Sequence, residues 1–138
     1  MIRGLSMGNS SSQSKRVLFV DDEDSIRATL PLILKSRGFD VSVAATVSEA
    51  VQSIRQHDFD VLLSDLNIGE EGDGYTVARA IREANPRSVT IILTGYPAFE
   101  TAVQGIREGI DDYVVKPADI DALVTTMEQK LASRRTRH

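Results

Sequence analysis

The chain alternates between short apolar runs and longer segments in which apolar residues recur at a helical spacing. Five short runs have the length, the β-branched content and the flanking polar or glycine residues that are typical of strands. They lie at residues 15–20, 41–43, 61–64, 90–93 and 113–115. The first, third and fourth runs are nearly all apolar, as in strands buried on both faces. The run 41–43 alternates apolar and polar residues and therefore predicts a half-exposed edge strand.

Five helices are predicted between and after these strands, at residues 25–36, 47–54, 75–83, 99–110 and 120–131. Each has apolar residues near positions i, i+3, i+4 and i+7, which form one face of a helix. The second helix has Thr46 or Ser48 as its N-cap, and Pro31 is expected to kink the first helix without ending it. The fourth helix is expected to turn a stripe toward the core that consists of Phe99, Ala102, Val103, Ile106 and Ile110.

Strict alternation of strands and helices with short connections predicts a parallel sheet with right-handed crossovers and helices on both faces. The fold class is therefore α/β: a single-domain, three-layer, doubly wound sheet of five strands. With the run 41–43 at one edge and the most apolar runs in the middle, the predicted strand order is 2-1-3-4-5, the flavodoxin-like order. Its switch point lies between the first and third strands, and ligands bind at the carboxyl ends of strands there.

Polar residues follow the predicted strands at this edge. The central run 61–64 stops at Asp65, and the loop with Gly69, Gly72 and Gly74 prevents the strand from continuing. Because the carboxyl ends of parallel strands share one edge, the sequence predicts a single cluster that contains Asp21, Asp22, Asp65, Thr94 and Lys116.

Three carboxylates at one edge repel one another unless a cation lies among them. Oxygen ligands without histidine or cysteine favour Mg²⁺, Mn²⁺ or Ca²⁺, and two or three carboxylates leave room for water and substrate oxygens, as Mg²⁺ prefers. A metal, the Lys116 ammonium and the Thr94 hydroxyl around Asp65 would form a receptor for a phosphoryl group. Asp65 is then the predicted nucleophile, which would form an acyl phosphate.

Composition narrows the class of protein further. The chain has 138 residues, a net charge of −4 and no cysteine, which fits one domain without disulfides or thiol chemistry. No apolar run reaches the roughly 20 residues of a membrane span, so we expect a cytoplasmic protein without a membrane partner. The acidic charge argues against nucleic-acid binding by the domain itself. We expect a disordered leader at 1–14, the domain at 15–133, and a frayed tail or linker at 134–138.

The chain resembles the receiver domain of two-component response regulators, similar to the chemotaxis response regulator, over about residues 15–133. The matching segments are Val20-Asp21-Asp22-Glu23, Asp65 after its strand, Thr94 after its strand, and Tyr113-Val114-Val115-Lys116-Pro117. The resemblance implies a magnesium site formed by Asp22 and Asp65, by Asp21 largely through water, and by the backbone carbonyl of Asn67. It also implies a cis peptide bond before Pro117.

The resemblance further implies that Asp65 takes a phosphoryl group from a sensor histidine kinase or a phosphotransfer protein. Lys116 would pair with that group, Thr94 would move toward it, and Tyr113 would turn inward. The face formed by the fourth helix, fifth strand and fifth helix would change as a result. An output domain, a partner protein or a homodimer would be the partner of this face. Such a domain is a phosphoacceptor for signalling and assists only its own phosphorylation and dephosphorylation.

The sequence departs from the family pattern at Gly69, where proline is usual, in a loop that looks one residue longer, and at Ala118, where an aromatic residue is frequent. Two other functions use similar groups. A phosphohydrolase of the haloacid dehalogenase type needs a second acid two residues after its nucleophile, where this chain has Asn67. A phosphate-independent interaction module of the same fold would have no need of the acids, Thr94 and Lys116. A calcium loop starting at Asp65 is excluded by Glu70 and Thr76, which stand where glycine and glutamate are required.

Overall fold

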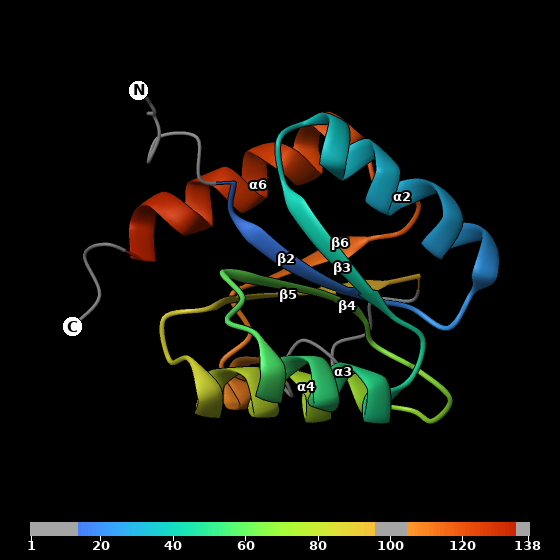
Figure 1. Cartoon of the computed structure of the whole chain (residues 1–138), viewed down its shortest axis with the longest axis vertical. Coiled ribbons are helices and arrows are strands. Elements are labelled where there is room, and N and C mark those ends of the chain that lie inside the picture. Colours follow the sequence, from blue (N-terminus) through green and yellow to red (C-terminus); the bar gives the residue numbers. More distant parts are fainter. Residues whose placement is uncertain (1–13, 96–104, 135–138) are drawn as a thin grey trace, which may run out of the picture.

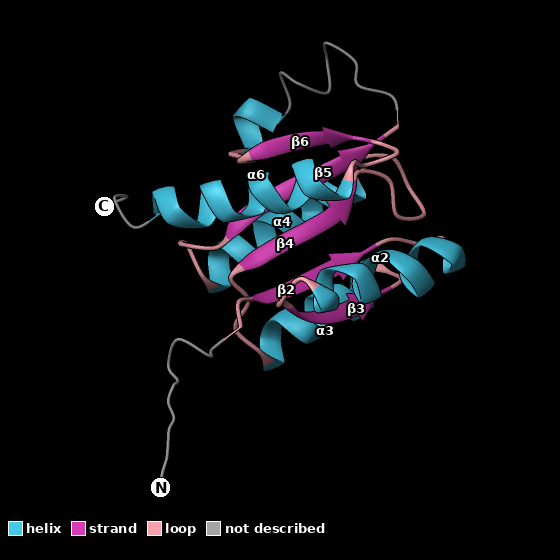
Figure 2. Cartoon of the chain, turned by 90° about the horizontal axis from the view of Figure 1, so that it is seen from above, coloured by secondary structure: helices cyan, strands magenta, loops and turns pink. Residues whose placement is uncertain are grey.

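The computed structural model describes residues 14–95 and 105–134. These residues contain one parallel sheet of five strands in the order β3-β2-β4-β5-β6. The strands are β2 (Arg16–Val20), β3 (Asp40–Ala44), β4 (Val61–Asp65), β5 (Val89–Thr94) and β6 (Asp112–Val115). Because β3 is the second strand along the chain and lies at an edge, the predicted order 2-1-3-4-5 is confirmed. All four strand pairs are parallel, and Figure 2 shows the strands side by side.

Helices cover both faces of this sheet (Figure 1). The helices α2 (Asp24–Ser36) and α6 (Ile120–Ser133) lie on one face, and α3 (Val47–Gln56) and α4 (Asp73–Ala84) lie on the other. Residues 105–108 are also helical. Among the described residues, no helix combines the length and the apolar character that a membrane crossing requires.

The core is split by the sheet into two main apolar clusters, because successive side chains of a strand point to opposite faces. In β2, Val17 and Phe19 pack in the cluster that includes Leu34 and Met127, on the side of α2 and α6. Leu18 and Val20 pack in the second cluster with residues of α3 and α4. This explains why β2, β4 and β5 are buried on both faces over most of their length and are mainly apolar, as the sequence indicated.

Several local predictions are confirmed, and element ends differ by one or two residues. The strand at 41–43 lies at the sheet edge as predicted, although its apolar face is buried only at Val41, and Val43 on the same face is 41% exposed. Thr46 is the N-cap of α3, and its side-chain oxygen accepts a hydrogen bond from the Glu49 backbone N–H. The helix α4 begins at Asp73 rather than Tyr75, so Gly74 belongs to the first turn of the helix and not to the loop. Pro31 lies inside α2, which continues to Ser36.

The apolar stripe predicted for the helix at residues 99–110 is wrong at Ile106, which is 81% exposed. Gly105 is the buried residue instead, and Tyr113 lies directly against it. The ring of Tyr113 occupies the space that a helix side chain would otherwise fill. Ile110 packs on the core as predicted, while Phe99, Ala102 and Val103 lie outside the described residues.

Arg134, which the sequence assigned to a frayed tail, is held against the domain. Its guanidinium forms an ion pair with the Asp60 carboxylate at 2.8 Å, and its side chain is only 12% exposed. It also donates to the Asp60 backbone carbonyl. Residues 135–138 and most of the predicted leader lie outside the described residues, so their assignment stays a prediction.

Candidate functional site

The site lies at the carboxyl ends of β2 and β4, which are neighbours in the sheet. Asp21 directly follows β2, and Asp65 is the last residue of β4. Both strands are buried along their length, so the polar residues begin only where the chain leaves the core. The predicted switch point between the first and third strands is therefore where these carboxylates meet.

Asp21, Asp22 and Asp65 form a carboxylate cluster, in which one oxygen of each residue lies within 4.8 Å of the others. Asp21 is fully buried and Asp22 is exposed, while the Asp65 side chain is 14% exposed. One oxygen of Asp21 accepts a hydrogen bond of 2.9 Å from the Glu23 backbone N–H. The cluster thus combines one buried carboxylate, Asp21, with the more accessible carboxylates of Asp22 and Asp65.

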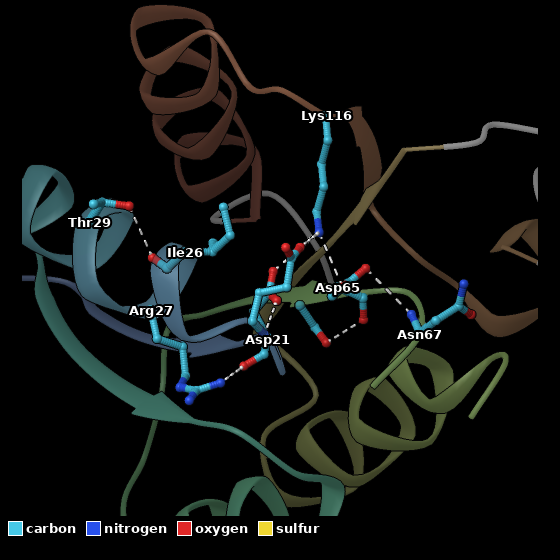
Figure 3. Close-up of polar contacts among 9 residues, drawn as sticks. Asp21, Ile26, Arg27, Thr29, Asp65, Asn67 and Lys116 are labelled. Atoms are coloured by element: carbon cyan, nitrogen blue, oxygen red, sulfur yellow. Dashed lines mark hydrogen bonds and ion pairs between the residues drawn. The ribbon is translucent and has the colours of Figure 1, made fainter. Parts of the chain in front are cut away.

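Lys116 reaches this cluster from the loop after β6 (Figure 3). Its ammonium lies 3.2 Å from Asp21 Oδ2 and 3.1 Å from Asp65 Oδ2, with Glu23 Oε1 farther away at 3.9 Å. The peptide bond between Lys116 and Pro117 is cis, as the family resemblance implied. The sequence prediction that Asp21, Asp22, Asp65 and Lys116 converge is confirmed by these distances.

The charges of the site act on one another through a partly buried environment. Burial raises the pKa of Asp65, and the charge of Asp21 raises it too. The hydrogen bond and charge of Lys116 lower it, but the net shift is upward. Burial by itself lowers the pKa of Lys116, yet Asp21 and Asp65 raise it more, so the net shift is also upward. Lys116 therefore stays charged but does not fully relieve the crowding of the carboxylates.

This donor set fits a hard divalent cation. All the clustered ligand atoms are carboxylate oxygens, which suit Mg²⁺ or Ca²⁺ rather than soft metals. Burial above all, together with the charge of Asp21, keeps the pKa of Asp65 raised although Lys116 lies beside it. A second cation is the simplest way to keep all three carboxylates ionised.

Two other predicted residues lie near this cluster. Thr94 is buried at the end of β5, one residue beyond Leu93, which pairs with Asp65 across the sheet. The backbone N–H of Asn67 approaches Asp65 Oδ1 at 3.5 Å, and its side-chain oxygen accepts a hydrogen bond from the Gly72 N–H. Asn67 therefore shapes the loop after Asp65, and Figure 3 shows it beside the carboxylate.

Tyr113 lies on the edge strand β6, which pairs with β5. Its hydroxyl is hydrogen-bonded to the hydroxyl of Tyr75 in α4, and its ring packs against the cluster formed by Leu66, Tyr75 and Ile92. The sequence reading missed Tyr75, since it looks like one more apolar residue of a helix. Glu23, which the sequence placed in a matching segment without a role, has an exposed carboxylate that faces Lys116.

Gly74 fixes the backbone behind Asp65. Its N–H donates to the Leu66 carbonyl at 2.7 Å. A Cβ atom at this position would lie 2.5 Å from the Asp65 carbonyl oxygen, closer than such atoms can approach. The first turn of α4 therefore rests directly on the main chain of Asp65.

A cleft of about 510 Å³ runs beside Lys116 between α2 and the start of α6. Its walls are mostly apolar and include Leu30, Ile33, Pro117 and Ile120. Ile33 in α2 is 38% exposed and forms part of this wall.

The structure thus combines a doubly wound α/β fold with an acid cluster and a lysine at its switch point. The family model for the response regulator receiver domain matches residues 17–128. The chain therefore belongs to the response regulator receiver domain family, a family of signalling domains in two-component systems.

Individual relatives agree with this assignment. The transcriptional regulatory protein ZraR of Escherichia coli (strain K12) is 35% identical over 116 residues, which cover 84% of this chain and 26% of ZraR. The chain thus spans about a quarter of the length of that relative. A CheY-like receiver domain from Methanospirillum hungatei JF-1 has a TM-score of 0.83 at 27% identity and covers 91% of this chain and all of its own.

A solved response regulator from Burkholderia pseudomallei contains a phosphorylated aspartic acid, a calcium ion and citrate. It is 26% identical to this chain, with a TM-score of 0.78, and the match covers 88% of this chain and 71% of that protein.

Proposed function

We propose that this domain is a phosphoacceptor in which Asp65 receives a phosphoryl group from a sensor histidine kinase or a phosphotransfer protein. The observation that carries the proposal is the position of Asp65, within 4.8 Å of the carboxylates of Asp21 and Asp22 and 3.1 Å from the Lys116 ammonium. The phosphorylated aspartic acid of the similar Burkholderia pseudomallei protein supports the same chemistry.

In the proposed reaction, a carboxylate oxygen of Asp65 forms a bond to the phosphorus of a phosphohistidine. The bond between phosphorus and the imidazole nitrogen breaks, and the nitrogen keeps its electron pair and takes up a proton. Lys116 lies 3.1 Å from Asp65 Oδ2, close enough for its charge to pair with an oxygen of the transferred group. The Thr94 hydroxyl at the neighbouring strand end is our candidate for a second donor to that group.

We assign Mg²⁺ as the cofactor, held by Asp22 and Asp65, by Asp21 largely through water, and by the backbone carbonyl of Asn67. When bound, it would neutralise charge on the phosphoryl oxygens. The buried Asp21, fixed by the Glu23 N–H and by Lys116, would keep the cluster in place before any ligand arrives.

The proposed output is a shift between two conformations of the face formed by the helix before β6, by β6 and by α6. Thr94 and Lys116 would rearrange around the phosphoryl group, and the population with Tyr113 inward would rise. Ile106 and Val115 are 81% and 51% exposed on this side of the domain. They offer apolar contact for an output domain, a partner protein or a second copy of the chain.

The proposal is tested by incubating the full chain with Mg²⁺ and acetyl phosphate and weighing the intact protein by mass spectrometry. We expect addition of one phosphoryl group, and complete loss of this addition in Asp65→Asn. Asp60→Asn is a matched control, because Asp60 stands at the other end of β4 and pairs with Arg134. Equal phosphorylation of Asp65→Asn would refute the assignment, and steady turnover of phosphomonoesters would favour a hydrolase instead.

A further inference from the structure

One face of α4 contacts the chain segment that leads to Tyr113. Tyr75, Arg79 and Arg82 stand at positions i, i+4 and i+7 and therefore share one side of the helix. Arg79 forms an ion pair of 2.8 Å with the Glu108 carboxylate. Arg82 donates to the Glu108 backbone carbonyl, and Tyr75 is hydrogen-bonded to Tyr113.

Tyr75 is the buried end of this row. It is 7% exposed and packs with Leu66 and Ile92, with Tyr113 against the same cluster. A tyrosine hydroxyl in such surroundings needs a hydrogen-bond partner, and the two hydroxyls supply one to each other. Burial, followed by the hydrogen bond to Tyr75, raises the pKa of Tyr113, so the proton that this hydrogen bond needs is retained.

Gly105 also lies directly against the side chain of Tyr113. A Cβ atom at residue 105 would overlap the hydroxyl and the ring of Tyr113. The ring thus lies in a slot that exists only because residue 105 has no side chain. Gly105 gives Tyr113 room, and Tyr75 gives its hydroxyl a fixed partner.

The same tyrosine is tied to the phosphoacceptor loop. Tyr75 directly follows Gly74, whose N–H bonds to the Leu66 carbonyl and whose backbone lies against the Asp65 carbonyl. A movement of the Asp65 main chain would therefore displace the first turn of α4, and Tyr75 with it.

We propose that Tyr75 is a positioning residue that holds Tyr113 in the slot beside Gly105 and links this position to the backbone of Asp65. The holding of Tyr113 stands on the contacts alone, whereas the link to Asp65 rests on the proposed phosphoacceptor function. In this receiver domain, the switch tyrosine is controlled by a hydroxyl on α4 as well as by the groups at the ends of β5 and β6.

The first test uses the full chain without a phosphodonor. The chain has three tyrosines, so selective ¹³C labelling of their rings gives a simple NMR spectrum, which single tyrosine-to-phenylalanine variants assign. Exposure of Tyr113 is measured as line broadening by a soluble paramagnetic agent. Tyr75→Phe removes only the hydroxyl, and loss of one neutral hydrogen bond should shift the ratio of exposed to inward Tyr113 by about fivefold.

Thr29→Val serves as the control for loss of a hydroxyl, because Thr29 is exposed on α2, on the other face of the sheet, and it should leave the broadening of Tyr113 unchanged. Gly105→Ala provides a second variant, in which Tyr113 should become exposed although Tyr75 is intact. Broadening of Tyr113 in Tyr75→Phe that equals the broadening in the parent would overturn the positioning role.

The second test adds Mg²⁺ and beryllium fluoride, which imitates an aspartyl phosphate. The shift of the Tyr113 resonance on addition should be smaller in Tyr75→Phe than in the parent, while acetyl phosphate still labels Asp65 in both. Equal shifts would overturn the link to Asp65. If acetyl phosphate labels neither protein, the proposed function fails, whereas the positioning of Tyr113 is still decided by the first test.

Discussion

Two aspartates flank the central strand β4, and their surroundings differ in a way that separates stability from function. Asp60 precedes the strand at the amino-end edge of the sheet, and Asp65 ends it at the carboxyl-end edge. Asp60 accepts a hydrogen bond of 2.8 Å from the Arg16 backbone N–H and pairs with Arg134 at 2.8 Å. Asp65 shares a single lysine with Asp21 and has Asp22 nearby.

The pKa values of the two carboxyls move in opposite directions. Burial raises the pKa of Asp60, but its bonds to Arg16 and Arg134 lower it more, and the net shift is downward. For Asp65 burial is again the largest cause, and the net shift is upward despite Lys116. The folded state thus stabilises the ionised form of Asp60 at one end of β4, whereas it disfavours the ionised form of Asp65 at the other. Such an unrelieved charge is typical of functional sites.

Of the substitutions at the two ends of β4, Lys116→Met is expected to change the free energy of unfolding most. The substitution removes the cation that pairs with the carboxylates of both Asp21 and Asp65, and it leaves the fully buried carboxylate of Asp21 without this ionic partner. We expect the free energy of unfolding to fall by about 2 kcal/mol in chelator, since breaking a buried pair from one side is costly.

Magnesium should restore part of this loss, because a ligand that binds the folded state alone stabilises it. Urea denaturation with EDTA and with Mg²⁺ measures both effects. The control is Lys35→Met, which removes an exposed lysine from the last turn of α2. A loss of stability no larger than that of the control would show that Lys116 is not needed to balance the carboxylates.

A smaller effect is expected at the opposite end of the strand. Asp60→Asn removes the charge that pairs with Arg134 and should lower stability by about 1 kcal/mol at neutral pH. Because the pKa of Asp60 is lowered in the folded state, its contribution is present above the unfolded value of 3.8 and is lost as the pH falls through the folded pKa. Urea titrations at pH 7 and pH 3 should therefore show a smaller difference from the parent at pH 3 than at pH 7. A difference that persists unchanged at pH 3 would contradict the pairing.

The architecture could be predicted from the sequence because it depends on repeated local patterns. Apolar strands such as 61–64 and the strict alternation with helices determined the strand order, and polar residues at strand ends indicated the convergence on Asp65. Strand ends were less accurate, because residues such as Asp40 and Asp112 belong to the sheet through pairing with Arg16 and Ile91. Their own side chains predict a turn.

Contacts between distant polar residues could not be predicted. Asp60 and Arg134 are separated by 74 positions, and neither stands in a motif that indicates the other. Ile106 fitted the helical spacing, yet the helix face is determined by the place of Tyr113 beside Gly105. Tyr75 was missed for the same reason, since a hydroxyl partner across two elements leaves no periodic signal. The clustered residues of the candidate site were found because they lie at strand ends, where topology alone brings them together.

The smallest expected effect has the opposite sign and concerns Asp65. Since its pKa is raised in the folded state, the folded protein binds the proton more tightly than the unfolded chain does. The ionised carboxylate therefore reduces stability at pH 7, and this penalty disappears below about pH 4, where both states are protonated. Asp65→Asn in EDTA should then be more stable than the parent at pH 7, by less than about 1 kcal/mol.

Asp22→Asn is the matched comparison, because Asp22 belongs to the same cluster but is exposed. Water screens an exposed carboxylate, so its removal should raise stability less than removal of the Asp65 charge. Thermal unfolding in EDTA measures the relative stability of the parent, Asp65→Asn and Asp22→Asn. If Asp65→Asn is destabilised as Asp60→Asn is, then Lys116 alone satisfies Asp65, and the two ends of β4 do not differ in the way that their pKa shifts indicate.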